Sequence, residues 1–420
     1  MELSTLGRLL LALLVIVTVA RLLGALARRL RQPPVIGEII GGVLLGPTLL
    51  HGEITTALFP AAVRPSLTNL ADIGVCVFMF LVGLEFDRGL LRGQGRIAAS
   101  VSLSAIVLPF SLGALLALYL TDHHPTDDRL TFVLFLGTAM SVTAFPVLAR
   151  ILTDKGLIST PIGGLALASA AVDDVLAWTL LAIVAALAGA AGAPWHVALV
   201  LPYAAALLWG VRPLLAKRAA RDRRPHWAVD AGVLTAVAGG LYLSARATEW
   251  MGLHLIFGAF LFGMALPREG ASRLRRTALP WVERISSLLL LPVFFMVAGL
   301  KVDLSGMDAT AFGELALILL VAIGGKSAGA FLGARVNGVR PRHSVVLALL
   351  INTRGLTELI VLTVGLQLGV LDQSLYSLMV VMALVTTAMT GVVLPFVYPE
   401  SRVREDLAAR ESPRTTRHVR

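Results

Sequence analysis

The sequence predicts an all-α polytopic membrane protein, and three observations lead to that fold class. Hydrophobic residues make up 57% of the chain and charged residues only 15%, with a mean hydropathy of +0.82. Apolar stretches of about 20 residues, long enough to cross a bilayer as a helix, recur along nearly the whole length. The segments between them alternate between rich and poor in Lys and Arg. A soluble core of this size does not need so many apolar residues, so we expect a bundle of membrane-spanning helices.

Thirteen stretches are expected to span the membrane, with boundaries defined to within several residues. The first is long enough to cross and is followed by arginines rather than by a small-residue cleavage site, so we expect it to remain as a helix. The thirteen predicted spans are residues 5–26, 34–50, 68–86, 97–120, 130–152, 160–187, 196–213, 228–245, 251–266, 285–301, 311–334, 343–368 and 374–397.

Basic residues divide the connecting segments into two alternating sets. One set, together with the C-terminal tail, holds 28 of the 36 Lys and Arg residues. The positive-inside rule then predicts a protein of the cytoplasmic membrane with its N-terminus outside and its C-terminus in the cytoplasm, which fits an odd number of spans. Topology therefore explains the net charge of +10 better than nucleic-acid binding does. The single cysteine, Cys76, excludes an intramolecular disulfide.

An internal repeat relates the two halves of the chain. VFMFLVGLEFD (77–87) in the third span resembles VFFMVAGLKVD (293–303) in the tenth. GGVLLG (41–46) and GAFLFG (258–263) follow at nearly the same spacing. Because the loop charges make the third and tenth spans cross in opposite directions, the repeat predicts the inverted topology of many transporters. Chance recurrence of short Gly, Leu and Phe strings is the alternative.

Two spans carry residues that interrupt a helix. The fifth contains SVTAFPVLARIL (141–152), in which a proline removes a backbone donor. The twelfth contains NTRGLTELIVL (352–362), whose polar residues and glycine disfavour a continuous apolar helix. Discontinuous helices in matching positions of two repeats indicate a transport site, although a simple proline kink would explain the fifth span alone. The residues expected at the two breaks are Ser141, Thr143, Pro146, Asn352, Thr353 and Gly355.

Charged residues inside the predicted spans are costly to bury. Asp173 and Asp174 stand together in SAAVDDVLAW, and a carboxylate at the bilayer centre costs at least ~2.5 kcal/mol on insertion scales. Lys326 and Arg354 are the intramembrane cations available to pair with them. Arg354 and Glu358 are four residues apart and face the same side of a helix, which predicts a local ion pair. A purely structural role, with both acids fixed by the two cations, is the alternative to ion binding.

These motifs resemble those of the monovalent cation/proton antiporter superfamily, in the branch of bacterial sodium/proton antiporters and plant cation/proton exchangers. The resemblance covers nearly the whole chain in order, in the segments PPVIGEIIGGVLLGP, FLVGLEFD, SVTAFPVLARIL, SAAVDDVLAW, LPVFFMVAGLKVDL, IGGKSAGAF and NTRGLTELIVL. It implies the sodium/proton antiporter fold, with 13 transmembrane helices, inverted-topology repeats and two crossing discontinuous helices.

The same resemblance implies a division into scaffold and core. The implied boundaries are 1–96 for the first scaffold and dimerisation helices, 97–190 for the core helices of the first repeat, 191–305 for a linker helix and the second scaffold helices, 306–398 for the core helices of the second repeat, and 399–420 for a short cytoplasmic tail.

The resemblance also implies roles for the intramembrane charges. Asp174 corresponds to the carboxylate that binds the ion and the proton, and Asp173 to the acid that pairs with a lysine, here Lys326. The two aspartates would hold the transported sodium, and the double-acid form resembles the electrogenic members of the family. Such members are usually homodimers whose core moves against the scaffold like an elevator.

The function expected from the sequence is exchange of sodium or lithium for protons, with no resident cofactor. Potassium/proton exchange on the same fold is the first alternative, because cation choice depends on cavity size and hydration. An organic-anion symporter or a channel is a further alternative, although neither needs a lysine opposite a titrating acid pair. No Walker motif, metal cluster or nucleophile constellation occurs, so an ATP-driven pump and an enzyme are not expected. The expected partners are monovalent cations, protons, membrane lipid and a second copy of the chain, but not nucleic acid.

Overall fold

The computed structural model describes residues 5–49, 52–85, 95–124, 126, 128, 129–158, 160–188, 199–221, 231–251, 255–266, 279–399 and 401–405. These residues form helices and connecting turns, with no β-strand among them. The helices are α1 (Thr5–Arg29), α2 (Pro34–Leu45), α3 (Glu53–Leu58), α4 (Arg64–Glu85), α5 (Gly95–Leu120), α6 (Arg129–Ser141), α7 (Phe145–Asp154), α8 (Pro161–Leu187), α10 (Val200–Ala205), η3 (Ala206–Val211), α11 (Arg212–Arg221), α12 (Ala231–Trp250), α13 (Leu255–Ala265), α15 (Leu279–Ile285), η4 (Ser286–Leu290), α16 (Leu291–Leu300), α17 (Ala309–Val336), α18 (Pro341–Ile351), α19 (Leu356–Gln367) and α20 (Gln373–Val397).

Within the described residues, eight helical segments are long and apolar enough to cross a membrane, or nine if the bent pair α18 and α19 counts as one span. The chain is therefore an all-helical polytopic membrane protein, while thirteen spans remain a prediction. The number of long helices is lower than thirteen partly because α2 and α13 contain only 12 and 11 residues. At 1.5 Å per residue each reaches about 17 Å, roughly half of the hydrocarbon core. For α2 the prediction ran past Leu45, where Gly46 and Pro47 follow the helix end.

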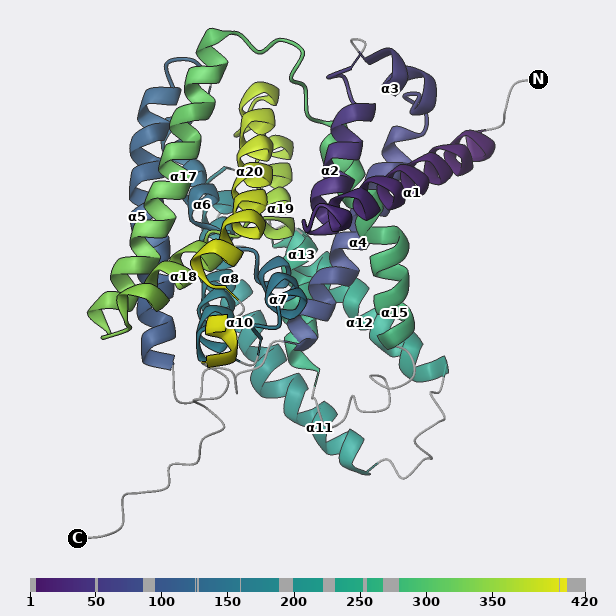
Figure 1. Ribbon diagram of the computed structural model, residues 1–420. Coiled ribbons are helices and arrows are strands. Elements are labelled where there is room, and N and C mark those ends of the chain that lie inside the picture. Colours follow the sequence, from purple (N-terminus) through teal and green to yellow (C-terminus); the bar gives the residue numbers. More distant parts are fainter. Residues whose placement is uncertain are drawn as a thin grey trace.

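Figure 1 shows two neighbouring groups of helices. We call α5–α8 with α17–α20 bundle A, because α5 packs along α6, α8 and α17, and α17 along α18 and α20. Bundle B contains α1, α2, α4, α12, α13, α15 and α16, and its contacts include α1 with α2, α2 with α16, and α4 with α13. The bundles meet where Trp178 of α8 packs edge-to-face on Phe257 of α13 and where the Tyr376 hydroxyl of α20 donates to the Ala298 carbonyl of α16 at 3.0 Å.

The two repeat segments lie at matching crossings in bundle B. Gly42 of α2 meets Gly299 of α16 so closely that a Cβ on either glycine would lie 2.8 Å from the Cα of the other. Gly83 of α4 and Gly263 of α13 cross in the same way, and a Cβ on either would lie 2.2 Å from a carbonyl oxygen of the facing helix. Only glycine permits this backbone approach. The contact between α2 and α16 therefore corresponds to the contact between α13 and α4. Asp87, at the end of the first repeat segment, lies outside the described residues.

Both predicted broken spans are interrupted in bundle A. In the fifth span, α6 ends at Ser141, the next three residues leave the helix, and α7 starts at Phe145. Pro146 thus follows the break and stands in the first turn of α7, where a backbone N–H has no intrahelical acceptor and proline is well tolerated. In the twelfth span, α18 and α19 meet at an angle of 44° across residues 352–355.

A histidine joins three elements at the end of bundle A opposite Arg335. His124, in the turn after α5, places Nδ1 at 2.6 Å from Asp372 Oδ2 and Nε2 at 3.2 Å from Glu314 Oε2. Only the imidazolium can donate to both carboxylates. Burial alone would lower the pKa of His124, but the hydrogen bonds and charges of Asp372 and Glu314 outweigh it and raise that pKa above its ordinary value of 6.5. His123 Nδ1 is the other nearby titratable group, at 3.8 Å from Glu314.

This cluster predicts that the chain loses stability as the medium becomes alkaline. Because the folded pKa of His124 exceeds 6.5, its stabilisation is complete below that pH and disappears as pH rises through the raised pKa. We expect His124→Gln to lower the free energy of unfolding by about 1–3 kcal/mol at pH 6 and by much less at pH 9. Thermal unfolding of the purified protein at both pH values measures this. A deficit that is equal at pH 6 and pH 9 would contradict it.

Candidate functional site

The two helix breaks cross each other inside bundle A. The Ala144 backbone N–H donates to the Thr353 carbonyl at 3.0 Å. The Thr143 hydroxyl lies 3.1 Å from the Ile351 carbonyl, and the Thr357 hydroxyl donates back to the Thr143 carbonyl at 3.3 Å. Each break thus supplies partners for the backbone groups that the other leaves free, which is required where no water is available. The crossing brings four helix ends together.

A glycine makes the crossing sterically possible. A Cβ at Gly355 would lie 2.6 Å from Val147 Cγ2, in the first turn of α7. Any larger residue at position 355 would therefore push the two breaks apart. Ser141, Thr143, Asn352 and Thr353, which the sequence predicted at the breaks, are all buried there.

The two adjacent aspartates of α8 point to different partners. Asp173 and Asp174 are buried, with 0% and 4% of their surfaces exposed. Asp174 accepts a hydrogen bond from the Phe145 backbone N–H, so it lies at the N-terminus of α7, where the helix dipole favours negative charge. Asp173 turns to α17, where the Lys326 ammonium lies 3.2 Å from Oδ2. Successive helical residues point about 100° apart, which accounts for this division.

Lys326 is fully buried at the crossing of α17 and α5. Besides Asp173, its ammonium donates to the Ser141 carbonyl and to the Ala105 carbonyl at 3.4 Å. These three acceptors match the three donors of an ammonium. The Ser141 carbonyl belongs to the last turn of α6, so Lys326 also neutralises the negative end of that helix.

Arg354 covers the same end of α6 from the second break. Its guanidinium donates to the Ala139 carbonyl at 2.9 Å and to the Met140 carbonyl at 2.6 Å, and it pairs with Glu358 at 2.7 Å. The spacing of four residues predicted the Glu358 contact, whereas the two carbonyl contacts were missed. The available signal was the break itself, because a helix that ends inside the membrane leaves carbonyls that a nearby cation must satisfy.

Several buried polar atoms at the crossing have no hydrogen-bond partner among the described residues. Oxygen atoms predominate in this set, and oxygen is the ligand that hard cations such as sodium take. Ser169 was not predicted from the sequence, yet its position one helical turn before Asp173 was a usable signal. The unpartnered atoms are Ser169 Oγ, Asp173 Oδ1, Asp174 Oδ1, Asn352 Oδ1 and Nδ2, Thr353 Oγ1, Arg354 Nε and Glu358 Oε1. The described residues thus leave six buried oxygen atoms at the crossing without a hydrogen-bond partner.

The buried charges at the crossing do not balance when every group is ionised. Three carboxylates belong to Asp173, Asp174 and Glu358, and two cations to Lys326 and Arg354. One uncompensated negative charge in a desolvated site is costly, so the site favours the gain of one positive charge. Asp174 is the carboxylate without a cationic side chain in contact among the described residues. One added positive charge, on or beside Asp174, would restore the balance.

The fold and this site define a class: polytopic helical transporters in which two broken helices cross at buried carboxylates. Residues 14–398 match the family model described as sodium/hydrogen exchanger, transmembrane. The chain therefore belongs to the sodium/hydrogen exchanger family, a family of antiporters.

Curated relatives support this membership. The chain is 40% identical over 410 residues to the Na(+)/H(+) antiporter NhaS4 of Synechocystis sp., covering 95% of this chain and 99% of the relative. It is 37% identical to Cation/H(+) antiporter 20 of Arabidopsis thaliana and 32% identical to K(+)/H(+) antiporter 1 of Saccharomyces cerevisiae. The matches cover 92% and 89% of this chain but only 48% and 44% of those relatives, so the chain spans about half of their length.

A solved structure supports the fold. The sodium proton antiporter MjNhaP1 of Methanocaldococcus jannaschii at pH 8 superposes with a TM-score of 0.67 at 15% identity, covering 96% of this chain and all of that one. At this identity the likeness concerns the fold alone.

Proposed function

We propose that the protein exchanges sodium, or lithium, for protons across the cytoplasmic membrane. The observation that carries the proposal is the single uncompensated carboxylate at the crossing of two broken helices. Membership in the exchanger family and the 40% identity to an Na(+)/H(+) antiporter favour sodium as the cation. Potassium is the second candidate, because a relative at 32% identity is a K(+)/H(+) antiporter. An organic-anion symporter or a channel has no comparable support.

Competition between a proton and a cation for the same buried negative charge is sufficient for exchange. When Asp174 is protonated, the buried charges balance and a cation gains little by entering. When the proton leaves, the negative charge attracts a cation, and Asp173, Asp174, Ser169 and Thr353 offer oxygen ligands. If the site changes sides only when loaded with a proton or a cation, each cation moved one way requires a proton moved the other.

Lys326 provides a route to an electrogenic cycle. Sodium that binds between Asp173 and Asp174 would draw Asp173 away from the ammonium. A buried ammonium without its carboxylate partner is disfavoured, so Lys326 would release a proton as sodium binds and regain it on return. With the proton of Asp174, this gives two protons for each sodium ion and one net charge moved per cycle. The sodium-loaded site then keeps one uncompensated negative charge, a cost that exchange of one proton for one sodium ion avoids.

The two bundles suggest how the site changes sides. Bundle A carries every charged residue of the site, and bundle B carries the glycine crossings related by the inverted repeat. We propose that bundle A is the moving core and bundle B the scaffold, which forms the contact of a homodimer, and that the core moves like an elevator. In this proposal the moving segments are those that the family resemblance implies, residues 97–190 and 306–398.

The first prediction concerns Asp174. The variant Asp174→Asn keeps the shape of the side chain but removes the charge that a proton or cation would neutralise. We expect sodium uptake driven by a pH gradient to fall to the level of empty proteoliposomes, with an unfolding temperature close to that of the wild type. Retained uptake in this variant would remove Asp174 from the mechanism.

A second prediction separates the roles of Lys326. The variant Lys326→Gln cannot release or regain a proton. If the lysine carries the second proton, transport is lost or becomes electroneutral. Recordings of transport current on a solid-supported membrane, with wild type alongside, measure this. Surviving transport that still generates current and responds to membrane potential would mean that Lys326 only stabilises the core.

The third prediction concerns orientation, which the arginine distribution indicates. We expect the N-terminus outside and the C-terminal segment from Arg402 in the cytoplasm. In a Cys76→Ala background, Asp122→Cys should react with a membrane-impermeant thiol reagent in intact cells, whereas Arg402→Cys should react only after permeabilisation. Labelling of Arg402→Cys in intact cells would contradict this topology and indicate the opposite orientation.

A further inference from the structure

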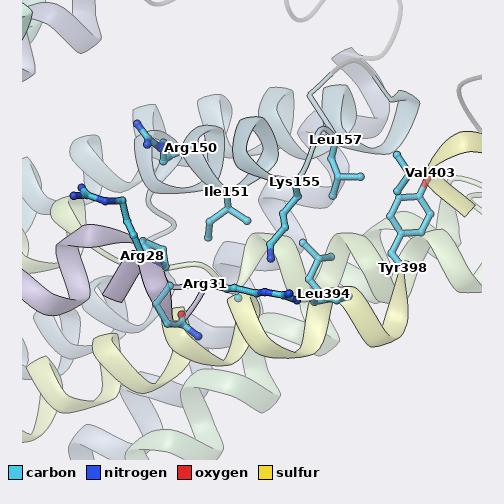
Figure 2. A pocket seen from close by; sticks show the side chains of 13 residues that line it. Arg28, Arg31, Arg150, Ile151, Lys155, Leu157, Leu394, Tyr398 and Val403 are labelled. Atoms are coloured by element: carbon cyan, nitrogen blue, oxygen red, sulfur yellow. The ribbon is translucent and has the colours of Figure 1, made fainter. Parts of the chain in front are cut away.

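A basic cavity lies apart from the buried carboxylates, at the arginine-rich face of the molecule. It has a volume of about 600 Å³ and is bounded by the end of α1, the end of α7 and the last turns of α20 (Figure 2). Four basic side chains line it, namely Arg28, Arg31, Arg150 and Lys155, and no acidic residue is among the described lining residues. Its size is that of a small-molecule site, and its basic lining favours an anion over a cation.

The cavity is shared between the two bundles. Arg28, Arg31 and Gln32 belong to α1 and the turn after it, in bundle B. Arg150 and Lys155 belong to α7 and its C-cap, in bundle A. Gly391, Leu394 and Pro395 of α20 add another part of the wall from the same bundle. Figure 2 shows the Lys155 side chain extending toward Arg31, which lies alongside α20. A ligand in this cavity therefore contacts both bundles at once.

The backbone at Arg31 is a second and independent observation. Helix α1 ends with hydrogen bonds from Arg31 N to the Arg28 carbonyl and from Gln32 N to the Ala27 carbonyl, at 3.0 and 2.9 Å. In this termination the residue at position 31 is left-handed, and its φ is +59°. Arg31 is the sole non-glycine residue with positive φ in the described part of the chain. Glycine is preferred there, because the left-handed conformation brings the Cβ of an L-residue close to a backbone oxygen.

Arg31, at this left-handed position, places its guanidinium group in the lining of the cavity. The residues that follow, Pro33 and Pro34, fix the direction in which the chain leaves α1. Gln32 adds a contact between the bundles, since its amide donates to the Ala388 carbonyl of α20 at 3.3 Å, while its Oε1 has no partner among the described residues. A general excess of arginine on one membrane face accounts for basic residues here, but it does not require Lys155 of one bundle to extend toward Arg31 of the other across a concave site.

We propose that this cavity binds a phosphate-bearing anion with at least two negative charges, and that the bound anion ties bundle A to bundle B and slows exchange. Guanidinium groups of Arg28 and Arg31 from bundle B and the ammonium of Lys155 from bundle A match the oxygens of such an anion. The anion is either a soluble phosphate compound or the headgroup of an anionic lipid. The effect on exchange rests on the proposed antiport function, whereas binding does not.

Binding is tested first, without transport. Thermal unfolding of the full chain in detergent is followed with increasing inorganic pyrophosphate, and in parallel with the chain in phosphatidylcholine vesicles with or without cardiolipin. We expect a rise of several degrees with one of the two probes. Arg31→Gly, which suits the left-handed backbone and removes the charge, and Lys155→Gln should each require at least tenfold more of that probe. Arg342→Gln, which removes a charge from a neighbouring groove on the same face, is the matched control.

The outcomes identify the source of the anion. A response to pyrophosphate indicates a soluble phosphate compound, and a response confined to cardiolipin vesicles indicates a lipid headgroup. No response to either probe, or equal responses of wild type and Arg31→Gly, would overturn the site. In proteoliposomes the effective probe should slow wild-type exchange at least twofold and leave Arg31→Gly unaffected. Equal slowing of both would overturn the tie between the bundles, whereas exchange absent in every protein would refute the antiport function and leave the binding result standing.

Discussion

Two helices that stop inside a membrane leave backbone groups that no water can satisfy, and the rest of the site depends on this constraint. The end of α6 exposes the carbonyls of Ala139, Met140 and Ser141, and they are met by Arg354 and Lys326. The start of α7 exposes N–H groups, and Asp174 meets one of them. The charges that stabilise the broken helices are thus the same charges to which we assign ion binding.

The balance of those charges links stability to function. Two cations are committed to backbone carbonyls as well as to Asp173 and Glu358, so neither is free to neutralise Asp174. A site with every acid paired would be more stable and would have no reason to bind a cation. The remaining carboxylate is consistent with a site that is completed alternately by a proton and by a transported ion.

The sequence predicted the fold class, both helix breaks and the buried charged residues, because intramembrane charge and helix-breaking residues are visible without structure. It did not predict how Arg354 and Lys326 use backbone carbonyls, because those contacts join residues more than 180 positions apart. The predicted second span is longer than α2, because apolar residues continue beyond Leu45, where the helix ends. The His124 cluster was also missed, because its acids come from α17 and α20, which no local pattern relates to the turn after α5.

If one buried site holds either a proton or a cation, sodium binding to the purified protein must be coupled to the release of protons. Calorimetric titration with sodium over a series of pH values, in buffers with different ionisation enthalpies, gives both the affinity and the number of protons released. The account predicts at least one proton released per sodium ion bound, and an apparent Kd that rises about tenfold or more for each pH unit on the acid side of the transition. Sodium binding with constant affinity and no proton release across that range would contradict it.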